Sequence, residues 1–442
     1  MSDLLAIGAS GIKAYSRALS VVGDKIANAQ TDGYVRRTVR LEEAPAAGDL
    51  VLSRNSLRPG GVLAAGVTRE IDQWLVDDAR TASGEAARQS ARLDWLSVTE
   101  SALDNGGDSI SGSVTAIFAT ADQLSANPND PTLRSQFLSS VDESASAFRR
   151  TSASLASAAN GVATEAQSAV DQLNTDLSAL TRVNDGLRRA RAGSTNEATL
   201  LDERDRLVGN IAAAIDVNVT YDARNAAIVR TPSGDPLVEG DYLATVTLSV
   251  SAGGLLSFGI APATSLQPAS GRLAGLSDAA THISNQRAGL DLLAANLSSA
   301  LNSAHQAGFD ANGNPGAALF NFTGSAANMT AAALDTSEVA TASAASSNGN
   351  MLAFNSVRAS SGIEQNISAF VAQQAQATAA ARAQEAAASG RRDGAFAARD
   401  AIGAVDLDRE AADLLRFQQA YEAAARTIQV ARETMQTMLN IF

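Results

Sequence analysis

Both ends of the chain carry apolar side chains that recur every seven residues. At the N-terminal end the repeat consists of Leu5, Ile12, Leu19 and Ile26, with Gly8, Tyr15, Val22 and Ala29 three residues after each. At the C-terminal end it consists of Leu407, Leu414, Tyr421, Ile428, Met435 and Phe442, with Ala411, Gln418, Ala425, Arg432 and Leu439 as alternate seam positions. This spacing predicts helices with one narrow apolar seam, which a single helix cannot bury. The ends must therefore pack on each other, on the rest of the chain or on other subunits.

The sequence predicts one long helix at each end, over residues 3–29 and 407–442. Acidic residues crowd the first turn of the second helix, where the helix dipole favours negative charge. Small or polar residues occupy about half of the seam positions, so a hairpin of these two helices would be marginal in isolation. We expect the ends to be poorly ordered in a lone monomer and to become ordered on assembly. The alternative is that the two helices complete a bundle within one chain.

The middle of the chain is expected to be helical, with one β-rich interruption. Helical patterns dominate residues 72–214 and return over 271–305 and 362–389, whereas alternating apolar and polar residues begin at Ile215. The predicted fold class is mainly α with a small β-rich insert, combining discontinuous N- and C-terminal coiled-coil helices with a helical bundle in the middle. The expected domains are 1–70 with 401–442 (terminal coiled-coil core), 71–214 with 271–400 (helical middle) and 215–270 (β-rich insert).

Two local features of the middle are informative. Asn127–Asp130 reads as a sharp break, after which Pro131 suits the first turn of a helix and Asp130 suits its cap. Asn105–Asp108 reads as a turn. The segment 324–350 is rich in Ala, Ser, Thr and Asn and carries no pattern that assigns it to helix or strand.

Composition excludes several kinds of chemistry. The 34 basic and 47 acidic residues give a net charge of −13, which disfavours nucleic-acid binding. The absence of Cys excludes disulfides, thiolate nucleophiles and Cys-ligated zinc, and His282 and His305 do not form a zinc-protease motif. No apolar run approaches the ~18 residues of a membrane helix. The N-terminus lacks the features of a secretory signal peptide, so the chain is expected to be cytoplasmic or exported without cleavage.

The densest charge cluster is Asp202–Arg206. Asp202 and Asp205 would suit acid–base catalysis, but no His, Lys or Cys lies near them in the sequence. We expect ion pairs on a helix surface instead, with Asp202 paired to Arg206 four residues later.

A second candidate site begins at Asp310, where Asp310, Asn312 and Asn314 resemble the opening of a calcium-binding loop. The loop requires Gly and Glu at positions that Pro315 and Asn321 occupy here, so we expect a turn. The two histidines are expected to be surface or packing residues. The sequence therefore predicts no catalytic, cofactor-binding or metal-binding residues.

Sequences beside the two repeats resemble those of one protein family. Residues 27–36 are similar to the N-terminal signature of bacterial flagellar rod, hook and hook-associated proteins, and residues 406–426 resemble the matching C-terminal signature. The signature residues are Ala27, Asn28, Thr31, Gly33, Tyr34, Gln418 and Gln419. Four interior blocks resemble the hook-associated members that join hook to filament; they lie at 123–130, 201–208, 271–276 and 305–310. Asp32 departs from the pattern, since many relatives have Pro there.

This resemblance implies a non-enzymatic structural subunit of the flagellum that joins the hook to the filament. The terminal helices would line the central channel, and the β-rich insert would face outward. The implied partners are further copies in a homo-oligomer ring, the flagellar hook protein, a second hook-associated protein on the filament side and a dedicated export chaperone on the C-terminal helix. Export would use the flagellar type III apparatus. The expected assembly interface consists of Leu5, Ile12, Tyr15, Leu19, Val22, Ile26, Leu407, Leu414, Tyr421, Ile428, Met435, Leu439 and Phe442.

Three alternatives remain open at this point. The chain could be a rod or hook subunit, which shares the two end signatures. It could carry an enzyme in the β-rich insert, or it could be a cytoplasmic coiled-coil scaffold. The insert offers an enzyme few candidate groups, namely Asp222, Arg224, Arg230, Asp235, Glu239 and Asp241.

Overall fold

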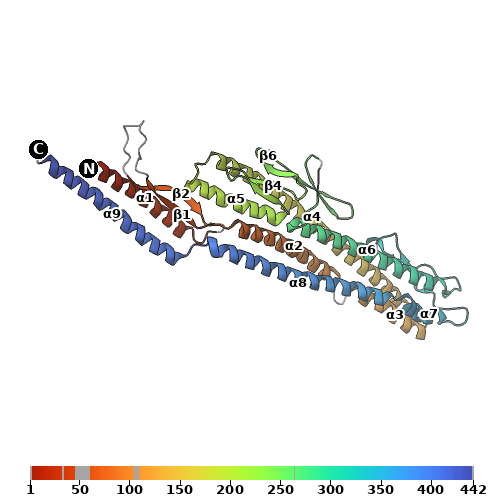
Figure 1. Cartoon of the computed structure of the whole chain (residues 1–442). Coiled ribbons are helices and arrows are strands. Elements are labelled where there is room, and N and C mark those ends of the chain that lie inside the picture. The colour runs from red at the N-terminus through yellow and green to blue at the C-terminus, as the bar shows by residue number, and fades with distance from the viewer. Residues whose placement is uncertain (1, 32–33, 45–59, 104–108, 263, 441–442) are drawn as a thin grey trace. The chain divides into compact units, whose positions relative to one another are not determined.

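A computed structural model describes residues 2–31, 34–44, 60–103, 109–262 and 264–440 of the chain (Figure 1). Helices make up most of these residues, which confirms the predicted mainly α-helical fold. The helices are α1 (Ser2–Ala27), α2 (Gln73–Leu103), α3 (Ile110–Ala126), α4 (Pro131–Arg189), α5 (Thr195–Ala214), α6 (Gly271–Gln306), α7 (Gly349–Ser361), α8 (Ile363–Gly403) and α9 (Leu407–Leu439). The expected turn at Asn105–Asp108 lies outside the described residues.

The strands form small antiparallel sheets. The sheets are β1 (Arg37–Ala44) with β2 (Gly61–Arg69); β3 (Asn218–Tyr221), β4 (Ala227–Arg230), β5 (Pro236–Glu239) and β6 (Tyr242–Leu243); β7 (Val246–Val250), β8 (Leu256–Ile260) and β9 (Thr264–Leu266); and β10 (Phe320–Asn321) with β11 (Thr330–Ala331). Apolar patterns near 35–41, 215–221, 226–230, 243–250 and 255–260 predict strands, and β1, β3, β4, β7 and β8 lie there. No pattern predicted β2, whose glycines and neighbouring proline are typical of irregular chain, or the short strands β5, β9, β10 and β11.

The chain is divided into two compact units. The first comprises Met1–Gly84, Leu173–Thr245 and Ser389–Phe442, and the second comprises Glu85–Gln172 and Val246–Ala388. This grouping differs from the expected three-part division, because the β-rich segment 215–270 does not stay together. Strands β3–β6 form one sheet in the first unit, and β7–β9 form a separate sheet in the second.

The second unit has a core of large, fully buried side chains from α3, α4, α6 and α7. Phe137 and Phe354 meet edge to face with ring centroids 5.8 Å apart, and Phe118 and Phe148 are buried with them. As predicted, α4 begins at Pro131, and the Asp130 carboxylate accepts the backbone N–H groups of the first turn. This unit thus has the close-packed interior expected of an independent helical bundle.

The segment 324–350 contains only short regular elements, namely β11 and the 3₁₀ helices Ala326–Asn328 and Thr336–Glu338, and side chains hold much of the rest in the second unit. The buried guanidinium of Arg134 donates hydrogen bonds to the carbonyl oxygens of Thr336 and Val339, at 3.0 and 3.1 Å, and to Thr341 Oγ1 at 3.1 Å. The same group donates to the carbonyl of Pro128 at 2.7 Å. One arginine therefore satisfies carbonyl groups that neither a helix nor a strand pairs.

His305 also holds this segment and is a packing residue, as expected. Its Nε2 accepts the N–H of Ala340 at 2.9 Å, so its Nδ1 carries the hydrogen and donates to the carbonyl of Ala317 at 2.6 Å. Burial lowers the pKa of His305 below its ordinary value of 6.5, because desolvation disfavours the charged ring. The other histidine, His282, bonds to Gln374.

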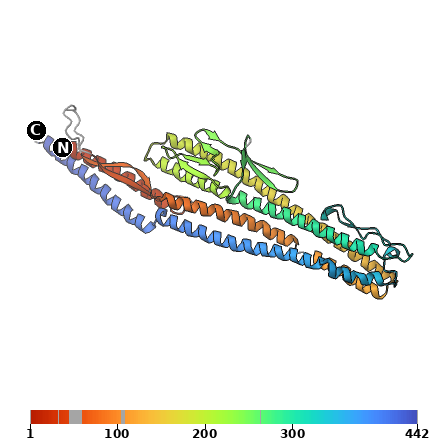
Figure 2. The same cartoon turned by 45° about the vertical axis from the view of Figure 1, so that its right-hand side comes forward.

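The first unit contains both terminal helices. Helix α1 packs along α9, and the two run in opposite directions side by side in both views (Figures 1 and 2). The β1–β2 hairpin covers α1, and the N–H of Val67 on β2 donates to the carbonyl of Gly193 before α5, at 3.0 Å. Val21, Val67 and Ala198 form a small buried cluster where α1, β2 and α5 meet.

Candidate assembly surface of the terminal helices

Helices α1 and α9 approach closely because glycine and alanine line their contact. A Cβ atom at Gly8 would lie 2.6 Å from Ile428 Cγ1, and one at Gly11 would lie 3.1 Å from Ala424 Cβ. Each glycine costs an isolated helix about 1 kcal/mol relative to alanine. Here the missing side chain lets the two backbones pack together, so the same residues that weaken α1 alone permit its pairing.

A buried ion pair closes the other end of this contact. Lys25 Nζ binds a Glu410 carboxylate oxygen, and the two side chains are 6% and 2% exposed. Gly11 and Lys25 are 14 residues apart (25 − 11), as are Glu410 and Ala424 (424 − 410). The two contacts therefore fix an antiparallel register over two seven-residue repeats.

The structure places the expected interface residues mainly along the edges of this contact. Val22 is buried, whereas Leu5, Ile12, Tyr15, Leu19, Leu414 and Ile428 are half-buried, and Ile26, Leu407, Tyr421 and Met435 are exposed. The Leu439 side chain and Phe442 lie outside what the structure describes. Contact of these side chains with other subunits stays a prediction.

Three of the alternate seam positions predicted on α9 are exposed, namely Ala411, Gln418 and Arg432, whereas Ala425 is half-buried. Glu410 is buried against Lys25 of α1, Ala431 is also buried, and Phe417 and Ala424 are half-buried. The positions that lie toward α1 are 410, 417, 424 and 431, which follow residues 407, 414, 421 and 428 by three residues and not by four. Apolarity alone pointed to neither choice, because the inner positions include a glutamate and two alanines.

The pair still presents large apolar side chains to solvent. They are Leu4, Ile7 and Ile26 on α1 and Leu407, Leu415, Tyr421, Val430, Met435 and Met438 on α9. We call these nine residues the outer apolar surface. They do not form one stripe, since Tyr421 and Val430 are nine residues apart and lie on opposite sides of α9. Exposed apolar residues on several sides of a helix pair suit contacts with more than one neighbouring chain.

The N-terminal signature residues shape the end of α1. Asn28 Nδ2 donates to the carbonyl of Asp24 at 2.9 Å, and Thr31 Oγ1 donates to Asn28 Oδ1 at 3.3 Å. The Arg37 guanidinium carbon lies over the Tyr34 ring, 4.7 Å from the ring centre. Burial raises the pKa of Tyr34 to about 12. Ala27, Gln418 and Gln419 are exposed, and Gly33 lies outside the described residues.

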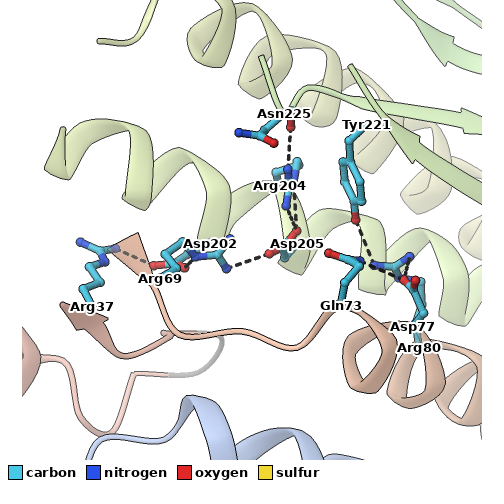
Figure 3. A network of polar contacts seen from close by, with 10 residues as sticks. All are labelled: Arg37, Arg69, Gln73, Asp77, Arg80, Asp202, Arg204, Asp205, Tyr221 and Asn225. Atoms are coloured by element: carbon cyan, nitrogen blue, oxygen red, sulfur yellow. Dashed lines mark hydrogen bonds and ion pairs between the residues drawn. The ribbon is translucent and has the colours of Figure 1, made fainter. Parts of the chain in front are cut away.

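The charge cluster Asp202–Arg206 ties the β1–β2 hairpin to α5 (Figure 3). Asp202 binds Arg37 Nη2 at 2.5 Å and Arg69 Nε at 2.7 Å, and Arg69 Nη2 also binds Asp205 at 2.7 Å. The expected pair of Asp202 with Arg206 was wrong, because Arg206 binds Glu203 on the solvent side. Asp202 faces inward toward two arginines that are distant in sequence.

The network continues from α5 toward β3. Arg204 bonds Asp205 through two nitrogens, at 2.6 and 2.9 Å, and its guanidinium lies 4.2 Å from the ring centre of Tyr221. Tyr221 Oη accepts a hydrogen bond from Arg80 at 3.3 Å, as Figure 3 shows. These carboxylates thus hold the β1–β2 hairpin, α5 and the end of β3 together.

The remaining candidate groups also form local structure. Asp310 accepts the backbone N–H groups of Asn312 and Asn314, both at 2.8 Å, which makes the expected turn. Asp222 does the same for Arg224 and Ala226. In the insert, Arg230 pairs with Glu239, Arg188 pairs with Asp241, and Asp235 accepts from Thr231.

Two further properties concern only the residues that the structure describes. Among them, no cluster of three or more His, Cys, Asp or Glu side chains is arranged to bind a metal ion. Within the same ranges, no helix combines the length and apolarity needed to cross a bilayer.

Comparison with known proteins connects these features to one family. The family described as flagellar hook-associated protein FlgK, helical domain, matches residues 96–320. The family described as flagellar basal body rod FlgEFG protein, C-terminal, matches residues 404–441, which contain α9. The two matches cover a large part of the bundle and the C-terminal terminal helix.

Two similar proteins are both named flagellar hook-associated protein 1. Flagellar hook-associated protein 1 of Salmonella typhimurium is 27% identical over 340 residues, and the match covers 73% of this chain but only 60% of that protein. Flagellar hook-associated protein 1 of Bacillus subtilis is 26% identical over 498 residues, covering 97% of this chain and 96% of that protein. The chain thus spans about three fifths of the length of the Salmonella relative and nearly all of the Bacillus one.

The solved structure of the flagellar hook junction protein FlgK from Burkholderia pseudomallei is similar in fold. The TM-score is 0.50 at 22% identity, covering 55% of this chain and 46% of that chain. Since the helical-domain match alone covers half of the sequence, the chain belongs to the family of flagellar hook-associated protein FlgK.

Proposed function

We propose that the chain is a structural subunit of the bacterial flagellum that joins the hook to the filament, and that it acts by self-assembly without catalysis. The observation that carries this proposal is the outer apolar surface on the α1–α9 pair. Family membership and the near full-length similarity to the Bacillus subtilis relative support it. The proposed place of action is the hook–filament junction, outside the cell.

Self-assembly would bury the outer apolar surface between copies. Burial of apolar area contributes roughly 25 cal/mol per Å². A contact between unlike faces of identical subunits closes into a ring when the rotation between neighbours closes. We propose such a ring, with the hook protein on one side and a second hook-associated protein on the filament side.

Export precedes assembly in this proposal. The chain would leave through the flagellar type III apparatus, with a chaperone covering α9 until then. Met435 and Met438 are exposed near the end of α9 and suit such a temporary contact, because methionine side chains adapt to different partners. No disulfide has to form or break during export, because the chain has no Cys.

Deletion of residues 405–442 tests whether assembly requires α9. We expect the truncated protein to keep a folded second unit, since its core uses no residue of α9. We also expect it to leave cells without attached filaments, measured by motility in soft agar and by filament protein in the medium. Normal motility of cells with the truncated protein would contradict the proposal.

A point substitution tests the outer apolar surface itself. Val430 is 61% exposed on α9, so Val430→Asp should leave the monomer folded while preventing assembly. The neighbouring exposed residue provides the matched control, because Gln429→Asp adds the same charge without removing an apolar side chain. We expect loss of motility for Val430→Asp and normal motility for Gln429→Asp. Equal motility of both variants would contradict assembly through this surface.

A rod or hook subunit is the second candidate, favoured by the match of residues 404–441 to the rod-protein C-terminal family. Immunogold labelling of isolated flagella distinguishes the two. Label confined to a thin zone between hook and filament supports the junction role, whereas label along the hook or rod supports the alternative. Recovery of the protein only from the cell interior would favour a cytoplasmic scaffold instead.

A further inference from the structure

Trp74 on α2 is the most exposed large apolar side chain that the structure describes. It is 70% exposed, and Asp77 and Asp78 follow it within about one turn of the helix. Asp77 binds Arg80 at 3.0 Å, and Asp78 binds Arg391 of α8 at 3.1 Å, so ion pairs hold both carboxylates on this part of α2. An exposed aromatic ring with charged neighbours is typical of an anchor residue in a protein interface.

The first unit also contains a hollow with a volume of about 460 Å³. It is lined by residues from the chain after α1 and after β2, from α2 and α5, and from the end of α8. Ile71, Val76, Phe396 and Val405 form part of its apolar lining. A hollow with such a lining can bury one large side chain that has an apolar body and a polar group.

Trp74 and the hollow lie on opposite sides of α2. The residues of α2 that line the hollow are Val76, Ala79, Arg80 and Ser83, which recur at the spacing of one helix face. Successive residues of a helix are about 100° apart, so Trp74, two residues before Val76, projects from the other face. The Trp74 side chain therefore cannot enter the hollow of its own chain, whereas it can enter the hollow of another copy.

The chemistry of the two sites is complementary. A buried indole N–H needs an acceptor, and the carboxylates of Glu70 and Asp400 line the hollow. The acidic residues beside Trp74 would meet opposite charge, because the partly exposed guanidinium groups of Arg206 and Arg399 also line it. Opposite charges around an apolar centre favour one partner orientation over others.

We propose that Trp74 of one copy inserts into this hollow of a second copy. The inference rests on the proposed self-assembly and adds a contact that is separate from the outer apolar surface. Because the two faces are unlike, each copy offers Trp74 to one neighbour and its hollow to another. This is the head-to-tail contact from which a ring is built.

Disulfide trapping between two differently tagged full-length chains tests this contact without background, because the natural sequence has no Cys. One chain carries Thr81→Cys, at an exposed position on the Trp74 face of α2, and the other carries Ala404→Cys, at an exposed position that lines the hollow. A third chain carries Ala383→Cys, exposed on α8 outside the hollow, and measures trapping by random collision. We expect about fivefold more heterodimer with Ala404→Cys than with Ala383→Cys.

Two substitutions should each lower the heterodimer yield to the collision level. Trp74→Ala in the Thr81→Cys chain removes the inserted side chain. Gly209→Leu in the Ala404→Cys chain fills the hollow, and that chain stays folded because nothing lies within 4 Å of an added Cβ and leucine favours the helix. Gly390→Leu is the matched control, since it has the same free space on α8 outside the hollow and should leave the yield unchanged.

Equal heterodimer yields with Ala404→Cys and Ala383→Cys would overturn the proposal. An excess that survives Gly209→Leu, or one that Gly390→Leu also removes, would overturn it too. Equal yields together with loss of motility for Trp74→Ala would assign Trp74 to contact with a different protein. The trapping needs no flagellum, so its failure is distinguishable from failure of the outer apolar surface in the Val430→Asp test.

Discussion

The core of the second unit and the α1–α9 pair are both helix-on-helix contacts, yet they are built from different side chains. The former buries phenylalanines completely, including Phe118, Phe137 and Phe148. The latter meets through glycine, alanine and one ion pair, and leaves its larger apolar residues half-buried or exposed. The helical bundle therefore buries its large apolar side chains within one chain, whereas the terminal helices leave part of their apolar side chains exposed.

The largest expected effect tests this contrast with one kind of substitution in two places. Phe137→Ala should lower the free energy of unfolding of the second unit by about 3–5 kcal/mol, because it leaves a cavity in a close-packed core. Phe417→Ala in α9 should cost about 1 kcal/mol, because that ring is half-buried. Hydrogen exchange resolved by segment measures both. Similar losses at the two sites would abolish the comparison.

The second prediction concerns the ion pairs of Asp202, which hold the β1–β2 hairpin on α5 in the first unit. Asp202→Ala should lower the free energy of opening of the β1–β2 hairpin by about 3 kcal/mol, because it leaves Arg37 unpaired and Arg69 with only Asp205. Glu203→Gln, one residue away, removes a solvent-side pair and should change it by less than about 0.5 kcal/mol. Amide protection of β1 and β2 is the measurement. Equal effects would mean that the network is not what anchors the hairpin.

A third prediction separates two glycines of α1. Gly8→Ala should lower the stability of the α1–α9 pair by about 1–2 kcal/mol, because the new methyl group would collide with Ile428. Gly23→Ala should raise it by up to about 1 kcal/mol, because nothing lies within 4 Å of the added Cβ and alanine favours the helix. Hydrogen exchange of α1 reports both changes. A gain in protection for Gly8→Ala would contradict the close packing.

The smallest expected effect depends on pH and is confined to the second unit. The pKa of His305 is lowered in the folded chain, so below its ordinary value of 6.5 the unfolded chain binds the proton more readily. The stability that His305 contributes is therefore complete above about pH 6.5 and is lost as the pH falls below it. Urea unfolding at pH 7.5 and 5.5 should show the loss. His305→Gln should lack this component and His282→Gln should keep it.

The sequence was sufficient for elements that local pattern determines. The helix repeats at both ends, the start of α4 at Pro131 and its cap at Asp130 all follow from residues within a few positions of one another. The candidate interface followed less completely. The choice between 410 and 411 as the inner position depends on which face of α9 meets α1, and α1 is distant in the sequence.

The Asp202 network could not be predicted for the same reason. Arg37 and Asp202 are 165 residues apart in the chain. Arg206 lies four residues after Asp202 and is a possible partner on the same helix. Nothing in the neighbouring sequence indicates that Asp202 binds Arg37 and Arg69 of the β1–β2 hairpin instead. The available signal is the adjacent pair Arg36 and Arg37 directly at the end of the N-terminal signature, since a buried arginine needs a carboxylate partner from elsewhere in the chain.

The way Arg134 holds the segment 324–350 has a consequence for how this part of the chain can vary. The guanidinium reads mainly peptide carbonyls, which every amino acid supplies alike. Related chains can therefore exchange the exposed side chains of this segment, provided that Arg134, His305 and the buried residues Ala326, Met329 and Val339 are retained. The backbone path of this segment thus depends on residues outside it, which leaves its exposed side chains free to vary.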